Sequence, residues 1–226
     1  MTVLCWDFDG TLAYSDHLWS SCVHRALLET QPDCGISFSQ IRTCMASGFP
    51  WHTPEQDFTP YTGEKWWDFM NAHFERSYLS LGIDHEQAAI AAGKVRSLIK
   101  QPENYFLWPD SLDALTRARD AGCINILLSN NYPDLPEVMD ALGLTPHFSH
   151  CVISGVVGYD KPRPEIFRQA KALIPGDHRF LMIGDNPVAD IQGGNAAGMT
   201  TILVHKGQDH RADYCFENLK DILNIL

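Results

Sequence analysis

Short apolar runs that end in polar residues limit the fold of this chain more than any other feature. We expect strands over residues 3–6, 124–128, 151–153, 180–183 and 201–204. They are almost continuously apolar, as strands covered on both faces of a parallel sheet are. After Pro102 the runs alternate with helical patterns over 110–121, 135–142, 164–173, 188–197 and 217–226. Alternating strands and helices predict an α/β fold with a doubly wound parallel sheet.

The segment between residues 15 and 103 shows no strand pattern. We expect helices there over 15–28 with Ser15 as its cap, 39–46, 64–81 and 84–98, with a Pro- and aromatic-rich structured loop over 48–63. An insertion after the first strand lies beside that strand's carboxyl end, where open α/β sheets bind ligands. We therefore predict a catalytic core of residues 1–14 and 104–226 and an all-helical cap of residues 15–103.

The sequence Asp7-Phe8-Asp9-Gly10-Thr11 follows the first apolar run directly. Beyond a strand end, two carboxylates that are two residues apart are free to reach one pocket. Gly10 allows a tight turn and a close approach of a ligand to the main chain. Thr11 adds a hydroxyl at the pocket mouth. Taken alone, the stretch is equally compatible with a solvated turn.

Three later stretches carry the complementary chemistry. The second run ends in Ser129-Asn130, Lys161 stands in the loop Asp160-Lys161-Pro162, and Asp185 ends a later run with Asp190 five residues on. In this order, the four stretches resemble the motifs of the haloacid dehalogenase-like hydrolase superfamily, which has a Rossmann-like core. The resemblance covers roughly the first fourteen residues and the chain from about residue 105 onward.

The chemistry of these side chains fits phosphoryl transfer. Asp7 is the expected nucleophile and forms an acyl phosphate, and Asp9 is the expected general acid and base. Because a phosphate dianion repels a carboxylate, we expect Mg²⁺ bound to Asp7 and Asp185, since this ion prefers oxygen ligands. The resemblance implies that the main-chain carbonyl of Asp9 is the third protein ligand.

The remaining motif residues are expected to bind the substrate or support the site. Thr11, Ser129, Asn130 and Lys161 offer donors or positive charge to the phosphoryl oxygens. Asp190 either orients Asp185 or a metal-bound water, or is only an acid favourably placed near a helix N-terminus.

Several reactions are compatible with these motifs. The first is a phosphatase acting on a small phosphomonoester. A phosphomutase shares all four motifs, and a pseudo-enzyme that binds phosphorylated ligands is disfavoured by the presence of both Asp7 and Asp9. Asp9 also argues against dehalogenation, because dehalogenases of this superfamily generally lack it. Lys65 is better explained as a solvated residue than as an imine-forming lysine of a phosphonatase.

The aromatic side chains of the cap leave two interpretations open. Trp51, Trp66 and Trp67 either line the substrate site or form a small cap core. Specificity depends on such cap residues, so the motifs do not name the substrate.

The composition indicates a cellular compartment and disfavours some classes of binding partner. The net charge of −11 over 226 residues disfavours nucleic acid and anionic membranes as partners. Seven cysteines without a C-x-x-C pair suggest a reducing compartment. Without a signal-peptide or membrane-spanning pattern, we expect a cytoplasmic protein; its oligomeric state stays open.

Overall fold

One six-stranded parallel sheet forms the centre of the protein, which a computed structural model describes over residues 1–226. Its strand order is β5-β4-β1-β6-β7-β8. The strands are β1 (Thr2–Trp6), β4 (Ile124–Ser129), β5 (His150–Ile153), β6 (Arg179–Gly184), β7 (Thr200–Val204) and β8 (Tyr214–Phe216). All neighbouring strands are parallel, so the predicted doubly wound α/β fold is confirmed.

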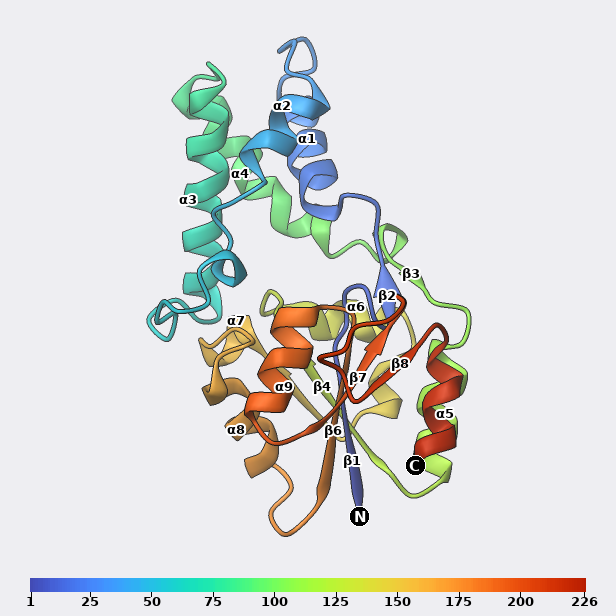
Figure 1. Cartoon of the computed structure of the whole chain (residues 1–226). Coiled ribbons are helices and arrows are strands. Elements are labelled where there is room, and N and C mark those ends of the chain that lie inside the picture. Colours follow the sequence, from blue (N-terminus) through green and yellow to red (C-terminus); the bar gives the residue numbers. More distant parts are fainter.

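Helices cover both faces of this sheet (Figure 1). They are α5 (Ser111–Asp120), α6 (Leu135–Ala141), α7 (Ser154–Val157), α8 (Pro164–Ala172) and α9 (Gly193–Ala196). Alternate residues of β1 point to opposite faces. Val3 and Cys5 belong to the apolar cluster that includes α8, whereas Leu4 and Trp6 belong to the cluster that includes α5 and α6. Burial on both faces explains why the strand reads as a continuous apolar run.

Four helices lie over the carboxyl-end edge of the sheet and form the predicted helical insertion (Figure 1). They are α1 (Leu18–Thr30), α2 (Phe38–Cys44), α3 (Glu64–Ser80) and α4 (His85–Ile99), and we call them and their loops the cap. Two short antiparallel strands, β2 (Ala13–Tyr14) and β3 (Phe106–Leu107), pair where the chain leaves and re-enters the core. The boundaries at residues 15 and 103 stay a prediction.

The local sequence predicted the start of one cap helix correctly and the start of another wrongly. Asp84 accepts a hydrogen bond from the Gln87 amide, as predicted for the start of α4. The prediction that Ser15 caps α1 is wrong, because the helix begins at Leu18 after His17, which takes a left-handed conformation with φ of 51°.

Two predicted helices also differ from the structure. The segment 188–197 begins as a wide π-helical turn, Pro187–Gln192, and continues as α9. The C-terminal segment 217–226 is a 3-10 helix, Leu219–Ile225, that follows the unpredicted strand β8. No helix of the protein is both long and apolar enough for a membrane span.

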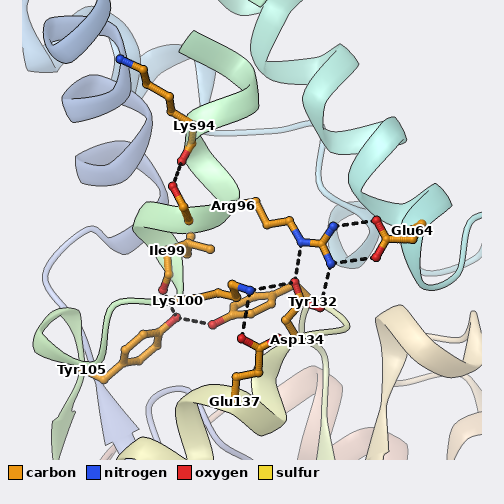
Figure 2. Close-up of polar contacts among 10 residues, drawn as sticks. Glu64, Lys94, Arg96, Ile99, Lys100, Tyr105, Tyr132, Asp134 and Glu137 are labelled. Carbon is orange, nitrogen blue, oxygen red and sulfur yellow. Dashed lines mark hydrogen bonds and ion pairs between the residues drawn. The ribbon is translucent and has the colours of Figure 1, made fainter. Parts of the chain in front are cut away.

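A charged network joins the cap to the core beside α6 (Figure 2). The guanidinium of Arg96, on α4, donates to both oxygens of Glu64 at 2.6 and 2.8 Å. It also donates to both oxygens of Asp134, next to the start of α6, at 2.7 and 3.0 Å. Lys100 extends the network to Glu137 at 2.9 Å. Paired hydrogen bonds of this kind fix orientation as well as supplying energy.

We expect Arg96→Met to destabilise the protein by about 1–2 kcal/mol at low salt, because a doubly bidentate contact is lost, and by less at high salt. The free energy of unfolding in urea measures the change. Arg117→Met is the control, since Arg117 makes only an exposed contact of 3.5 Å with Asp113 and should cost at most about 0.5 kcal/mol. Equal effects of the two substitutions would contradict a special role for the Arg96 network.

Candidate active site

Asp7 lies at the carboxyl end of the central strand and is almost fully buried. Its amide donates to the Ile183 carbonyl of β6 at 2.9 Å. Its Oδ1 atom accepts a hydrogen bond from the Ser129 hydroxyl at 2.8 Å and lies 3.0 Å from the Lys161 ammonium. Because β4, β1 and β6 are adjacent, the ends of three strands meet here.

Lys161 is buried beneath the site with only 1% of its side chain exposed. Its ammonium lies 2.6 Å from the Asp190 carboxylate as well as 3.0 Å from Asp7. Burial lowers the pKa of Lys161, but the two carboxylates outweigh it and the pKa is raised above its usual value. The ammonium therefore stays charged. Asp190 is fully buried and also accepts the Asn186 amide at 2.9 Å, so it holds Lys161 in place.

Asn130 fixes the main chain of the lysine loop. Its side chain donates to the Lys161 carbonyl at 2.9 Å and accepts the Lys161 amide at 2.6 Å. The Asn130 side-chain amide is thus engaged by protein, although the residue also lines the cavity. This contact explains how two loops that are 31 residues apart keep one geometry.

Asn131, which the sequence analysis missed, orients the second carboxylate. Its side-chain amide donates to Asp9 Oδ2 at 2.7 Å. Burial, with the nearby Asp7 charge as a second cause, raises the pKa of Asp9 to about 7. A carboxyl group with this pKa suits proton donation and acceptance near neutral pH. The only sequence signal for Asn131 was its place in a polar stretch after a strand.

Asp185 completes an acidic group with Asp7 and Asp190. Carboxylate oxygens of the three residues all lie within 4.8 Å of one another. Burial and then the Asp7 charge raise the pKa of Asp185, although Lys206, also missed by the sequence analysis, lies 3.3 Å away. Gly10 has a φ of 79° and touches Asp185 so closely that any Cβ would collide with the carboxylate.

Thr11 is not brought to the site in the way the sequence suggested. The residue is fully buried, its hydroxyl has no hydrogen-bond partner and it does not line the cavity. Its carbonyl instead accepts a hydrogen bond from His205 at 3.1 Å. Thr11 therefore supports the loop rather than offering a donor to a ligand.

A cavity of about 760 Å³ lies between these residues and the cap. Its floor includes Asp7, Asp9 and Asp185, and its far wall includes Trp19 and Trp51. Of the three cap aromatics considered from the sequence, only Trp51 lines the cavity. Trp66 and Trp67 are buried in the apolar cluster that the cap shares with the core, so both earlier interpretations hold for different residues.

Comparisons with known proteins agree with this geometry. A family model described as a haloacid dehalogenase-like hydrolase matches residues 1–198. A phosphoserine phosphatase of Thermus thermophilus is 37% identical over 54% of this chain and 51% of its own length, so the chain spans about half of that relative. A glyceraldehyde 3-phosphate phosphatase of Methanopyrus kandleri is 29% identical over 68% of this chain and 71% of its own.

One solved structure tests the fold along the whole chain. A hydrolase of the same superfamily from Bacillus subtilis, solved with bound magnesium, superposes with a TM-score of 0.73 at 22% identity. The alignment covers 100% of this chain and 97% of that chain. At this identity the likeness shows the fold, including the helical insertion.

We expect Lys161→Met to lower the free energy of unfolding by roughly 3–5 kcal/mol, because Asp7 and Asp190 would lose their buried counter-charge. Urea unfolding in the presence of chelator measures this loss. The double variant Lys161→Met/Asp190→Asn should recover part of it, since one of the two buried charges is then also removed.

Lys94→Met is the matched control. Lys94 is only partly buried and donates only to the Glu29 carbonyl at 3.2 Å. It should therefore change stability by less than about 1 kcal/mol. If Lys161→Met unfolds at the same urea concentration as the parent protein, the buried ion group does not stabilise the fold.

Proposed function

Because the chain belongs to the haloacid dehalogenase-like hydrolases, we propose that it hydrolyses a small phosphomonoester with Asp7 as nucleophile and Mg²⁺ as cofactor. One observation carries the proposal: the Asp7 carboxylate lies below the cavity with Oδ1 held by Ser129 and Lys161. No protein donor bonds Oδ2, which leaves this oxygen available to a substrate. The phosphatase names of the two relatives support the same reaction class.

The acidic group fits a hard divalent cation. Asp7 and Asp185 offer carboxylate oxygens, the ligands that Mg²⁺ prefers, and these oxygens lie within 4.8 Å of one another. Asp190 is already engaged by Lys161 and the Asn186 amide. We therefore assign the metal to Asp7 and Asp185, and the resemblance to the family implies the Asp9 carbonyl as a third protein ligand. Bound there, Mg²⁺ supplies Lewis-acid catalysis and offsets the repulsion between phosphate and carboxylate.

The side chains would act in two steps. Asp7 attacks phosphorus and forms an acyl phosphate, while Asp9 gives its proton to the departing oxygen. The Asp9 carboxylate then removes a proton from water, which attacks the same phosphorus and releases phosphate from Asp7. Lys161 keeps positive charge beside the Asp7 oxygen throughout, and Asn131 holds Asp9 toward the reacting atoms.

We expect Asp9→Asn to trap the covalent intermediate when the leaving group needs no proton. With nitrophenyl phosphate the variant should still phosphorylate Asp7, but breakdown should slow by roughly 100- to 10,000-fold because the base is gone. Intact-protein mass after quenching should show one added phosphoryl group, and peptide mapping should place it on Asp7. Asp7→Asn is the control, because it lacks the nucleophile and should gain no mass.

The same experiment tests the alternatives. Turnover that neither substitution changes would contradict the assignment of Asp7 and Asp9. A wild-type protein that binds phosphoesters but hydrolyses none would favour the pseudo-enzyme. Phosphoryl transfer to an added sugar in preference to water would favour the mutase.

We expect Asp185→Asn to weaken Mg²⁺ binding at least tenfold, because one anionic ligand becomes a neutral amide. Calorimetric titration with Mg²⁺ measures this without relying on turnover, and wild-type hydrolysis should stop in chelator and return with Mg²⁺. Asp113→Asn is the control, since Asp113 lies on an exposed face of α5. Full wild-type turnover in excess chelator would rule out the metal.

A further inference from the structure

The cap wall of the cavity is aromatic and held by packing. Trp51 lies in the short 3-10 helix Pro50–His52, and its ring stacks on Phe49 with centroids 4.8 Å apart and planes 14° apart. Trp19, near the start of α1, lies 5.9 Å from Trp51 and 6.0 Å from the buried ring of Trp66. Because these rings are braced from behind, the wall does not depend on a ligand for its shape.

This wall carries no fixed positive charge. Lys161 is the only lysine or arginine that lines the cavity, and its ammonium is already bonded to Asp7 and Asp190. His17 and His52 also line the cavity. His17 lies 4.0 Å from the Asp16 carboxylate. Partial burial lowers the pKa of His52, so that ring is neutral near pH 7. A second anionic group on a substrate would therefore lose water without gaining an ion pair with a lysine or arginine, which is unfavourable.

The floor and the cap wall of the cavity thus offer different kinds of contact to a substrate. The core residues at the cavity floor supply all of the fixed charge, and the cap wall offers flat apolar surface. A volume of about 760 Å³ exceeds what a two- or three-carbon phosphoester fills and lies within the range of sites for larger ligands, roughly 300–1,000 Å³.

We propose that the phosphomonoester this site selects has a leaving group with an uncharged, planar aromatic ring, which stacks on Trp51. This inference rests on the proposed phosphatase function and names its substrate class. Trp51 is then a specificity residue, and short carboxylated phosphoesters are poor substrates. The ring is attached either through a short alkyl linker or through a sugar, and both arrangements present the same flat face to the wall.

Two matched pairs of substrates test the preference while keeping the departing oxygen similar. The first compares 2-phenylethyl phosphate with 2-carboxyethyl phosphate, and the second compares uridine 5′-monophosphate with ribose 5-phosphate. We expect kcat/KM to favour the aromatic member of at least one pair by about tenfold or more, as the usual strength of stacking implies. The pair that shows the advantage reports how far the ring lies from phosphorus.

Variants of the wall show whether Trp51 is responsible. Trp51→Ala should reduce kcat/KM about tenfold for the preferred aromatic substrate and change that for 2-carboxyethyl phosphate less than about threefold. Trp51→Phe should keep the preference, and it replaces the alanine variant if that protein fails to fold. Tyr61→Ala is the control, because Tyr61 is exposed in the same loop and packs on Phe58 and Phe69 rather than lining the cavity.

A gain of function gives an independent readout. His52→Arg places a cation in the neutral wall and should raise kcat/KM for 2-carboxyethyl phosphate, whereas Tyr61→Arg should not. If the wild-type protein hydrolyses phosphoesters but neither pair favours the aromatic member, the inference is overturned while the phosphatase stands. Equal losses for all substrates in Trp51→Ala would overturn it likewise. A protein that hydrolyses no phosphoester under any condition removes the proposed function itself.

Discussion

The buried ammonium of Lys161 is the contact on which the site depends. An amine with 1% exposure is tolerable only if opposite charges and hydrogen bonds replace its water, and Asp7 and Asp190 do so at 3.0 and 2.6 Å. Asp7 follows β1, and Asp190 lies in the segment after β6. Asn130, which follows β4, fixes the loop that carries the lysine through its two hydrogen bonds to the Lys161 main chain. The arrangement that holds Asp7, the proposed nucleophile, is thus also the electrostatic link between three strands.

The loop that follows β4 connects this charged centre to the cap. Asn131 holds Asp9, and the next residue, Tyr132, bonds the Tyr105 hydroxyl at 2.7 Å and packs edge-on against Trp19 of the cap wall. Asp134, two residues further, binds Arg96 (Figure 2). The orientation of Asp9 and the position of the cap therefore depend on a single short segment, and a displaced cap would also disturb the Asp9 carboxyl group.

The sequence predicted the sheet and most helices because their signals are local. Apolar runs mark strands that are buried on both faces, and the polar residues after them fall at one edge of the sheet whatever the loops do. Features that depend on distant partners were missed: β2 needs β3, Lys206 needs Asp185, and the left-handed His17 replaces a cap at Ser15. Thr11 shows the same limit, because nothing nearby in the chain indicates that its hydroxyl is buried.

The cavity has a charged floor and an apolar cap wall, and this contrast explains why the family motifs alone do not identify a substrate. Under the proposed function, Asp7, Ser129 and Lys161 recognise a phosphoryl group, which every phosphomonoester carries, so their binding energy does not separate one substrate from another. Under that proposal, discrimination must come from contacts to the leaving group, and cap side chains that line the cavity, such as Trp51, are placed to make them. The side-chain partners of Asp7, Lys161 and Asp185 all come from the core, so cap residues can vary while the charged centre is preserved. The chemistry of a cap wall, rather than the motif set, is therefore the feature from which a substrate class can be argued.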